Sequence, residues 1–230
     1  MPMTFPAHQG LILPVVRRWP NSFDALALSV GAAMPDITDT ILGFPINGYF
    51  KQWYGHSLIG IFTLDFAGGL FITWLIAVLV RRSLKSVYIP KALQAFLSKA
   101  PPTRDPKGPG SHGRDRLKLW SFSLLVGILS HIGFDLISHN TNLLFYPWVE
   151  NAYWFPTWWY TTWFEVHPQF AFGRTYAVGV FTILWGLLTL LGSLLFLRFL
   201  SQEYEKRTTK LSSTRSRAEE ISSSSPAMDP

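Results

Sequence analysis

The sequence of 230 residues contains no cysteine, and charged residues make up only 15% of it. The absence of cysteine excludes disulfide bonds, thiolate metal ligands and a cysteine nucleophile, so any metal ion must be bound by His, Asp or Glu. The sequence also lacks a Ser-His-Asp arrangement, a glycine-rich phosphate loop and the mixture of basic and aromatic residues found in nucleic-acid grooves. We therefore expect no nucleic-acid partner. The first twenty residues lack the features of a cleavable signal peptide, and we expect none.

Apolar residues are abundant. They account for 48% of the chain, including 18 Phe and 10 Trp, and the mean hydropathy is +0.19. In a soluble protein of this size these side chains would form large apolar patches facing water, whereas lipid would cover them in a membrane. The composition therefore predicts a membrane protein whose main partner is the lipid bilayer.

Three segments are long and apolar enough to cross a bilayer, at residues 57–80, 119–138 and 176–200. A shorter apolar segment, 23–34, is typical of a buried or re-entrant helix, which we expect to end at Pro35. The sequence therefore predicts an all-α, multi-pass membrane helical bundle with three full spans plus one or two short N-terminal helices.

The distribution of charge predicts the orientation of these spans. Segment 81–118 holds ten of the twenty Lys and Arg residues against two acidic residues, so we expect a basic cytoplasmic loop. Segment 140–175 is poor in basic residues and rich in Trp, Tyr and Phe, which is typical of an outer loop lying along the headgroups. We predict a single membrane-embedded domain over 1–200, followed by a disordered cytoplasmic tail at 201–230. The protein is expected in the cell inner (cytoplasmic) membrane, and its oligomeric state is left open.

Acidic and histidine residues gather at the outer ends of the predicted spans. Asp36, Asp39 and His56 precede the first span, and His131, Asp135 and His139 end the second. The last three are four residues apart, so they share one helix face. Because a buried carboxylate costs several kcal/mol unless it is paired, three carboxylates and three imidazoles at one depth predict a bound cation. One zinc ion cannot reach all three residues of the second span, but two ions sharing Asp135 would fit.

Other interpretations of these residues remain open. An isolated membrane His often makes a helix–helix hydrogen bond, and the carboxylates of Asp36 and Asp39 are also suited to capping a turn. Ser57 is expected to orient the imidazole of His56. Glu165 and His167 are further candidate ligands from the outer loop.

The ordered motifs PAHQGLILP, AAMPDITD, YGHSLIG and GILSHIGFDLISH resemble an uncharacterised family of bacterial multi-pass membrane proteins, of the domain of unknown function 4184 type. More distantly they are similar to membrane-bound metal-dependent hydrolases and to the zinc-dependent phospholipase C and P1-type nuclease group. The resemblance adds His8 to the polar signature. By this analogy, a first ion is held by Asp36, His56, His131 and Asp135, while His139 binds a second and His8 a third.

His8 presents a problem of topology. Arg17 and Arg18 favour a cytoplasmic N-terminus, which would separate His8 from the other candidate ligands. Either the first thirty-five residues form a re-entrant pair that starts outside, or His8 does not belong to the site. The sequence leaves both alternatives open.

Two functions follow from these observations. The first is a membrane-bound hydrolase with one or two zinc ions at the outer face, Asp39 as general base and a phospholipid or lipid-linked phosphoester as substrate. Manganese or iron would also suit these ligands. The second is a non-catalytic membrane scaffold or partner-binding protein that metal stabilises. A small permease is a weaker third possibility, because three spans leave little room for a pathway.

Overall fold

The computed structural model of the protein describes residues 6–43, 54–83, 111–139, 144–149, 154–167 and 176–224. Most of these residues are helical. Three helical segments, Leu58–Leu79, Asp115–Ser138 and Val180–Lys206, are long and apolar enough to cross a membrane. The predicted all-α fold with three long spans is therefore confirmed.

The elements follow one another in a simple order. They are α1 (Ala7–Ile12), α2 (Pro14–Arg18), α3 (Ala25–Gly31), α4 (Met34–Gly43), α5 (Leu58–Gly60), the π-helical η1 (Ile61–Asp65), α6 (Phe66–Ser83), α8 (Ser111–Ser138), the 3-10 helix η2 (Thr157–Tyr160), β1 (Phe164–Val166), β2 (Tyr176–Val178) and α9 (Val180–Ser224). The N-terminal part thus holds four short helices rather than one or two.

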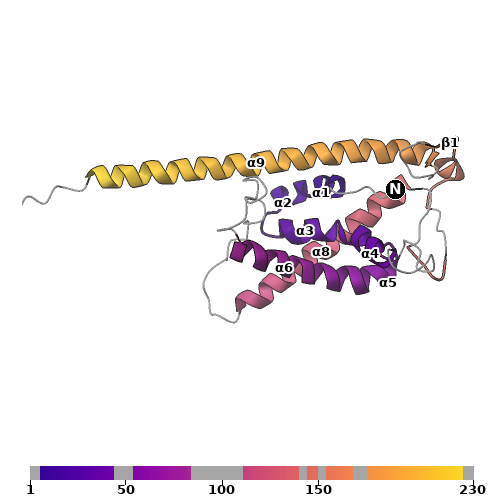
Figure 1. The fold of residues 1–230 in the computed structure, drawn as a ribbon, viewed down its shortest axis with the longest axis horizontal. Helices are drawn as coiled ribbons and strands as arrows, with labels where there is room; N and C mark the ends of the chain where they lie inside the picture. Colours follow the sequence, from indigo (N-terminus) through magenta and orange to yellow (C-terminus); the bar gives the residue numbers. More distant parts are fainter. Residues whose placement is uncertain are drawn as a thin grey trace, which may run out of the picture.

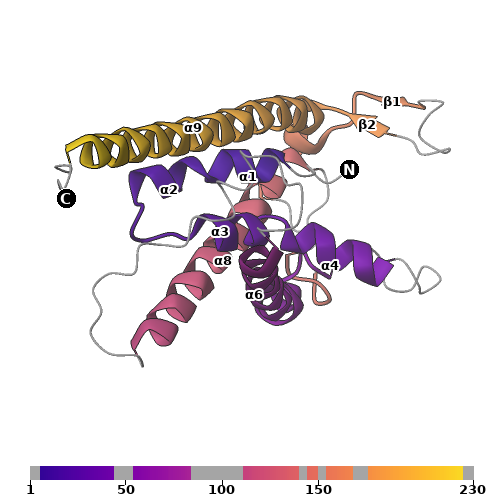
Figure 2. The same ribbon diagram turned by 60° about the vertical axis from the view of Figure 1, so that its left-hand side comes forward.

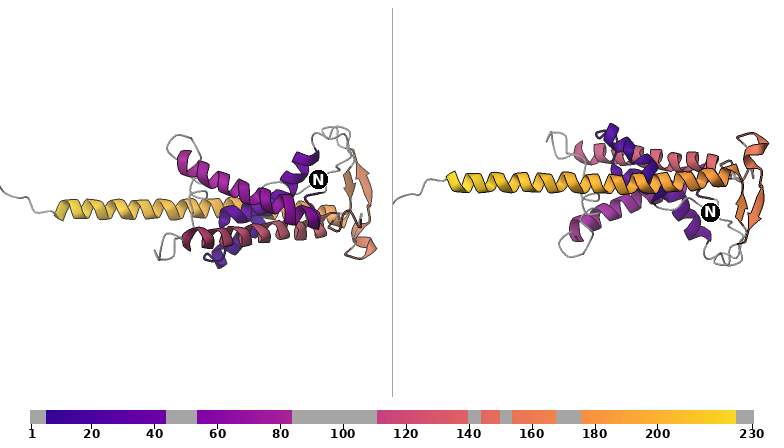
Figure 3. Two further views of the ribbon diagram at one scale, coloured as in Figure 1. Left: turned by 90° about the horizontal axis from the view of Figure 1, so that it is seen from below. Right: turned by 90° about the horizontal axis from the view of Figure 1, so that it is seen from above.

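The chain runs back and forth along the long helix α9 (Figures 1 and 2). Strands β1 and β2 form a two-stranded antiparallel sheet beside the start of α9, and we call this side of the molecule the hairpin end. Helix α1 lies nearer the hairpin end than α2 does, whereas α6 ends and α8 begins at the opposite end. Figure 3 shows α6 and α8 on the two sides of the line of α9.

The short helix α3 and its successor α4 are separated by a bend of 43°. Asp24 caps α3, since its carboxylate accepts a hydrogen bond of 2.8 Å from the Ala27 N–H. We expected Pro35 to end this apolar segment, and that expectation was wrong. Pro35 instead lies in the first turn of α4, where proline is tolerated because the N–H it lacks has no partner within the helix.

Glycine residues allow two pairs of helices to approach at backbone distance. A Cβ atom on Gly192 in α9 would overlap the carbonyl oxygen of Ala7 in α1. Similarly, a Cβ on Gly127 in α8 would overlap the carbonyl oxygen of Leu28 in α3. Small residues at such crossings are typical of helices that pack in membranes. These two contacts hold the N-terminal helices against α8 and α9.

The outer surface of the long helices is apolar. Leu187, Leu190, Leu194 and Leu197 of α9 are exposed, as is Phe71 of α6. The first buried hydrophobic cluster lies instead where α2 and α3 meet α9, and the second lies where α3, α4 and η1 meet α8. This arrangement suits lipid on the outside of the bundle.

Two further regions differ from the sequence-based expectations. Helix α9 continues through Ser224, so most of the tail at 201–230 that we expected to be disordered is helical. This tail has no Gly or Pro before Pro226 to interrupt the helix. The sheet of β1 and β2 is not predicted by the sequence; β1 falls within segment 140–175, and β2 directly follows that segment. Most of the basic segment 81–118 lies outside the described residues.

Candidate metal centre

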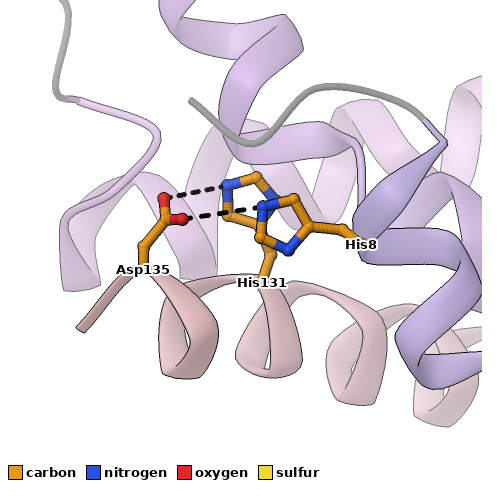
Figure 4. Close-up of side chains that lie close together, drawn as sticks. All are labelled: His8, His131 and Asp135. Atoms are coloured by element: carbon orange, nitrogen blue, oxygen red, sulfur yellow. Dashed lines mark ion pairs between the residues drawn. The ribbon is translucent and has the colours of Figure 1, made fainter. Parts of the chain in front are cut away.

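Four parts of the chain bring candidate ligands together near the hairpin end. Helix α1 contributes His8, α4 contributes Asp36 and Asp39, and His56 lies just before α5; the last two turns of α8 and the residue that follows contribute His131, Asp135 and His139. All seven residues that the sequence analysis singled out for the centre therefore lie in one region. Figure 4 shows three of them, with both His8 and His131 facing the carboxylate of Asp135.

His131 is fully buried, and a backbone carbonyl sets its orientation. Its Nδ1 atom lies 2.9 Å from the carbonyl oxygen of Ala32, in the bend between α3 and α4. Because a carbonyl oxygen only accepts, Nδ1 must donate this hydrogen bond. The Nε2 atom of neutral His131 then carries a lone pair, and it points toward the other candidate ligands.

His56 is oriented in the same way by a carboxylate. Its Nδ1 atom lies 2.6 Å from Oδ2 of Asp39, so Nδ1 donates to that oxygen. The other oxygen of Asp39 accepts a hydrogen bond of 2.6 Å from the backbone N–H of Gly55. Both oxygens of Asp39 are therefore engaged. This geometry suits a residue that orients His56 better than the general base that the sequence suggested.

Four donor atoms lie close to one another, and we call them the four-donor site: His56 Nε2, His131 Nε2, Asp135 Oδ2 and Asp36 Oδ1. The two nitrogens are 3.1 Å apart. Asp135 Oδ2 lies 2.9 Å from the nitrogen of His56 and 3.2 Å from that of His131, and Asp36 Oδ1 lies at 3.8 and 3.7 Å. Ligands about 2.0–2.1 Å from a tetrahedral zinc ion lie about 3.3 Å from one another. The distances among His56, His131 and Asp135 are close to this value, and Asp36 lies somewhat farther from the two nitrogens.

The charge of His56 depends on its surroundings. Burial opposes the protonated form, but hydrogen bonds with Asp135 and Asp39 outweigh it and raise the pKa of His56 to about 10. Without a metal ion, a proton on Nε2 therefore separates this nitrogen from the carboxylate of Asp135. The four-donor site therefore needs a positive charge beside His56 Nε2 both without a metal ion, when a proton supplies it, and with one.

His8 and His139 lie on the other side of the Asp135 carboxylate. His8 is 1% exposed, and its Nε2 atom is 3.6 Å from Asp135 Oδ1. Burial and the neighbouring His131 lower the pKa of His8 to about 3, so its imidazole is neutral at pH 7. The Nδ1 atom of His139 lies 3.4 Å from the same carboxylate oxygen and 3.1 Å from Ser138 Oγ.

The remaining candidates have other positions. Ser57 caps α5: its hydroxyl donates to the carbonyl oxygen of Tyr54 and accepts from the Gly60 N–H, which differs from the expected contact with His56. Glu165 and His167 are exposed in and directly after β1. Neither belongs to the groups of converging donor atoms found among the described residues. The carbonyl of Ala32 was missed, because no sequence pattern marks a backbone acceptor.

The centre is close to the end of the helix bundle and is partly open. Asp135 is one turn from the end of α8, and His56 is two residues before α5. The side chains of Asp36, Asp135 and His56 are 18%, 12% and 11% exposed, so water reaches this side of the site. The aromatic-rich segment 140–175 contacts the end of α8 near the centre, because the indole N–H of Trp159 donates a hydrogen bond to the carbonyl oxygen of Ile137 at 3.2 Å.

Comparison with known proteins identifies the family of the chain but no activity. No curated protein and no solved structure matches the sequence. One family model, described as "Domain of unknown function (DUF4184)", matches residues 1–223, which is nearly the whole chain. The protein therefore belongs to the DUF4184 family.

Proposed function

We propose that the protein is a membrane-bound, metal-dependent hydrolase whose divalent ion binds in the four-donor site. The observation that carries this proposal is the pair of Nε2 atoms of His56 and His131, only 3.1 Å apart. Each ring already donates its Nδ1–H to an oxygen acceptor. Two ring nitrogens this close together beside two carboxylates are unfavourable in a buried site unless a positive charge, either a proton or a metal ion, lies between them.

The donor set suits zinc, and imidazole and carboxylate ligands also accept manganese or iron. A divalent ion held here would lower the pKa of a bound water and polarise a phosphoryl or acyl oxygen. Asp39 keeps the Nδ1 proton of His56 in place, which directs the Nε2 lone pair inward. The carbonyl oxygen of Ala32 keeps the Nδ1 proton of His131 in place in the same way, which directs its Nε2 lone pair inward. Asp36, the most exposed of the four ligands, lies on the side from which water and substrate approach.

The position of the centre supports a lipid-derived substrate. The aromatic segments at the hairpin end expose Trp148, Trp154, Trp158 and Trp163, each more than half exposed. Tryptophan is enriched where membranes meet water. We call these four Trp residues the aromatic layer. A centre one helical turn below the aromatic layer would lie at headgroup depth, where phospholipids and lipid-linked phosphoesters present their ester bonds. The low content of basic residues in 140–175 supports an outer location for the hairpin end.

One observation also favours a purely structural ion. The four ligands come from α4, the residues before α5, and α8, so an ion would join three separate segments of the chain. A structural zinc ion is closed by four protein ligands, whereas a catalytic ion keeps a position for water. The two functions therefore differ in whether a small ligand such as azide or an added phosphodiester binds to the loaded site.

Metal analysis of the purified protein tests the proposal. Protein in mild detergent should contain zinc or another divalent metal, and His131→Ala and Asp135→Ala should lose the ion from the four-donor site while remaining inserted in the membrane. His167→Ala is the matched control, because it removes an exposed histidine outside the centre. Equal metal content in all four proteins would refute the site. Metal binding without turnover of any phosphodiester or lipid ester would favour the structural function.

A further inference from the structure

The centre contains two buried polar groups that the four-donor site does not use. Neither ring nitrogen of His8 makes a hydrogen bond within the described part of the chain, although the side chain is 1% exposed. The Oδ1 atom of Asp135 is also buried and makes no hydrogen bond there. Buried polar atoms without partners are uncommon in folded proteins, so this pair calls for a physical explanation.

The distance between His8 Nε2 and Asp135 Oδ1 suits two ligands of one metal ion better than a hydrogen bond. His8 Nε2 and Asp135 Oδ1 are 3.6 Å apart, which is too long for a hydrogen bond. Two ligands of one ion, each about 2.0–2.2 Å from it, lie about 3.3 Å apart in tetrahedral geometry and farther apart at wider angles. Figure 4 shows that His8 approaches one oxygen of the carboxylate while His131 approaches the other.

We propose that a second divalent ion binds between His8 Nε2 and Asp135 Oδ1, so that the Asp135 carboxylate bridges two ions. This inference rests on the proposed function, because Asp135 Oδ2 belongs to the four-donor site. A nitrogen of His131 also lies within 4.8 Å of donor atoms of His8 and Asp135, but one lone pair binds one ion, and we assign the Nε2 lone pair of His131 to the first site. His139 is the third side chain of the second site, because its ring lies beside Asp135 Oδ1 and is 13% exposed.

The packing of α1 supports a binding role for His8. The imidazole of His8 stacks on that of His131, with ring centroids 3.9 Å apart. The close approach of α1 to α9 at Gly10 and Gly192 leaves no room for α1 to move toward α9. The position of His8 is therefore set by helix packing, and its nitrogens are held ready for a ligand rather than paired with a neighbour.

A second ion would narrow the substrate class. Two-metal sites hold their ions about 3.5–4 Å apart and stabilise both the attacking and the leaving oxygen of a phosphoester. The inference therefore favours a phosphoester over a carboxylic ester as substrate. In the hydrolysis, water adds to phosphorus, the phosphorus–oxygen bond to the alcohol breaks, and that alcohol takes up a proton.

The test counts the ions and measures whether they are coupled. Full-length protein in detergent is loaded with zinc for elemental analysis and with Mn²⁺ for electron paramagnetic resonance. We expect two equivalents and a spin-coupled Mn²⁺ pair. His8→Gln should retain one equivalent and give the spectrum of isolated Mn²⁺. His139→Ala should weaken binding of the second ion, whereas Asp36→Ala should weaken binding of the ion in the four-donor site.

The outcomes separate the two proposals. One equivalent in the unaltered protein, unchanged by His8→Gln, would overturn the second ion and leave the four-donor site intact. No metal in the unaltered protein would overturn both. Because His8→Gln keeps a hydrogen-bonding side chain of similar size, the melting temperature of the metal-free variant shows whether α1 is still packed.

Discussion

The imidazole of His8 stacks on that of His131 with an interplanar angle of 28°, although His8 lies in α1 and His131 lies in α8, more than 120 residues later in the sequence. The contact places the N-terminus of α1 at the candidate metal centre. Arg17, at the end of α2, lies farther along α9, where its guanidinium donates to the carbonyl oxygen of Phe199 at 3.3 Å. The first helices therefore run from the centre toward the opposite end. This geometry is compatible with the re-entrant alternative, in which His8 and Arg17 occupy different depths.

The crossing of α1 and α9 gives a first prediction. Gly192→Ala should destabilise the protein by about 1–3 kcal/mol, because the new methyl group overlaps the carbonyl oxygen of Ala7. Gly186→Ala on the same helix meets no atom within 4 Å, so it should be neutral or stabilise by up to about 1 kcal/mol. Thermal unfolding in detergent measures both. Equal melting temperatures would contradict the close packing of these helices.

The second prediction concerns the role of Asp39. Asp39→Asn should weaken metal binding about 10–100-fold, since the amide orients the Nδ1–H of His56 less strongly than a carboxylate does. Asp24→Asn is the matched control: it alters another buried carboxylate, and Asn is an equally good helix cap. Competition with a chelator gives both affinities. Unchanged metal affinity with lost turnover would instead indicate that Asp39 is a general base.

The raised pKa of His56 predicts opposite pH dependences for folding and metal binding. In the metal-free protein, protonated His56 contributes to the free energy of unfolding fully below pH 6.5, and this contribution is lost as the pH rises toward about 10. A metal ion in the four-donor site must displace the proton from His56 Nε2, so each ion bound in that site between pH 7 and 9 releases one proton from His56. Metal affinity should therefore rise about tenfold per pH unit. Calorimetry in two buffers of different ionisation enthalpy measures the proton release, and its absence would contradict this explanation.

The orientation in the membrane is testable because the chain has no cysteine. Thr162→Cys lies in an exposed part of the hairpin end, and Ser212→Cys lies on the exposed part of α9 at the opposite end. In intact cells a membrane-impermeant maleimide should label the first variant, while the second should react only after the membrane is opened. The reverse pattern would place the metal centre at the cytoplasmic face.

The aromatic layer gives the last prediction. Replacing Trp148, Trp154 and Trp163 by serine should lower turnover of a phospholipid in vesicles much more than turnover of a small soluble phosphodiester. The physical reason is that these exposed indoles would bind the bilayer rather than the reacting atoms. Metal content should stay the same in this variant. An equal loss with both substrates would show that the aromatic residues act on the centre itself.

Several properties could be read from the sequence because they are local. A run of about twenty apolar residues is enough to define a span, and spacing of four places His131, Asp135 and His139 along one helix face. The choice of Asp36 and His56 as partners followed from their position next to a span. The cost of burying carboxylates in lipid supplied the reason to expect them close together.

Contacts between distant segments decided the rest. The participation of His8 depends on the glycine contact between α1 and α9, and such a contact depends on two backbones that no local pattern relates. The free nitrogen of His131 depends on the carbonyl of Ala32, which every residue type would provide equally. Residue types and helical periodicity thus determined which side chains were available for a metal centre. Only the tertiary packing determined which atoms of these side chains face one another, because hydrogen bonds from other elements set the orientation of each ring.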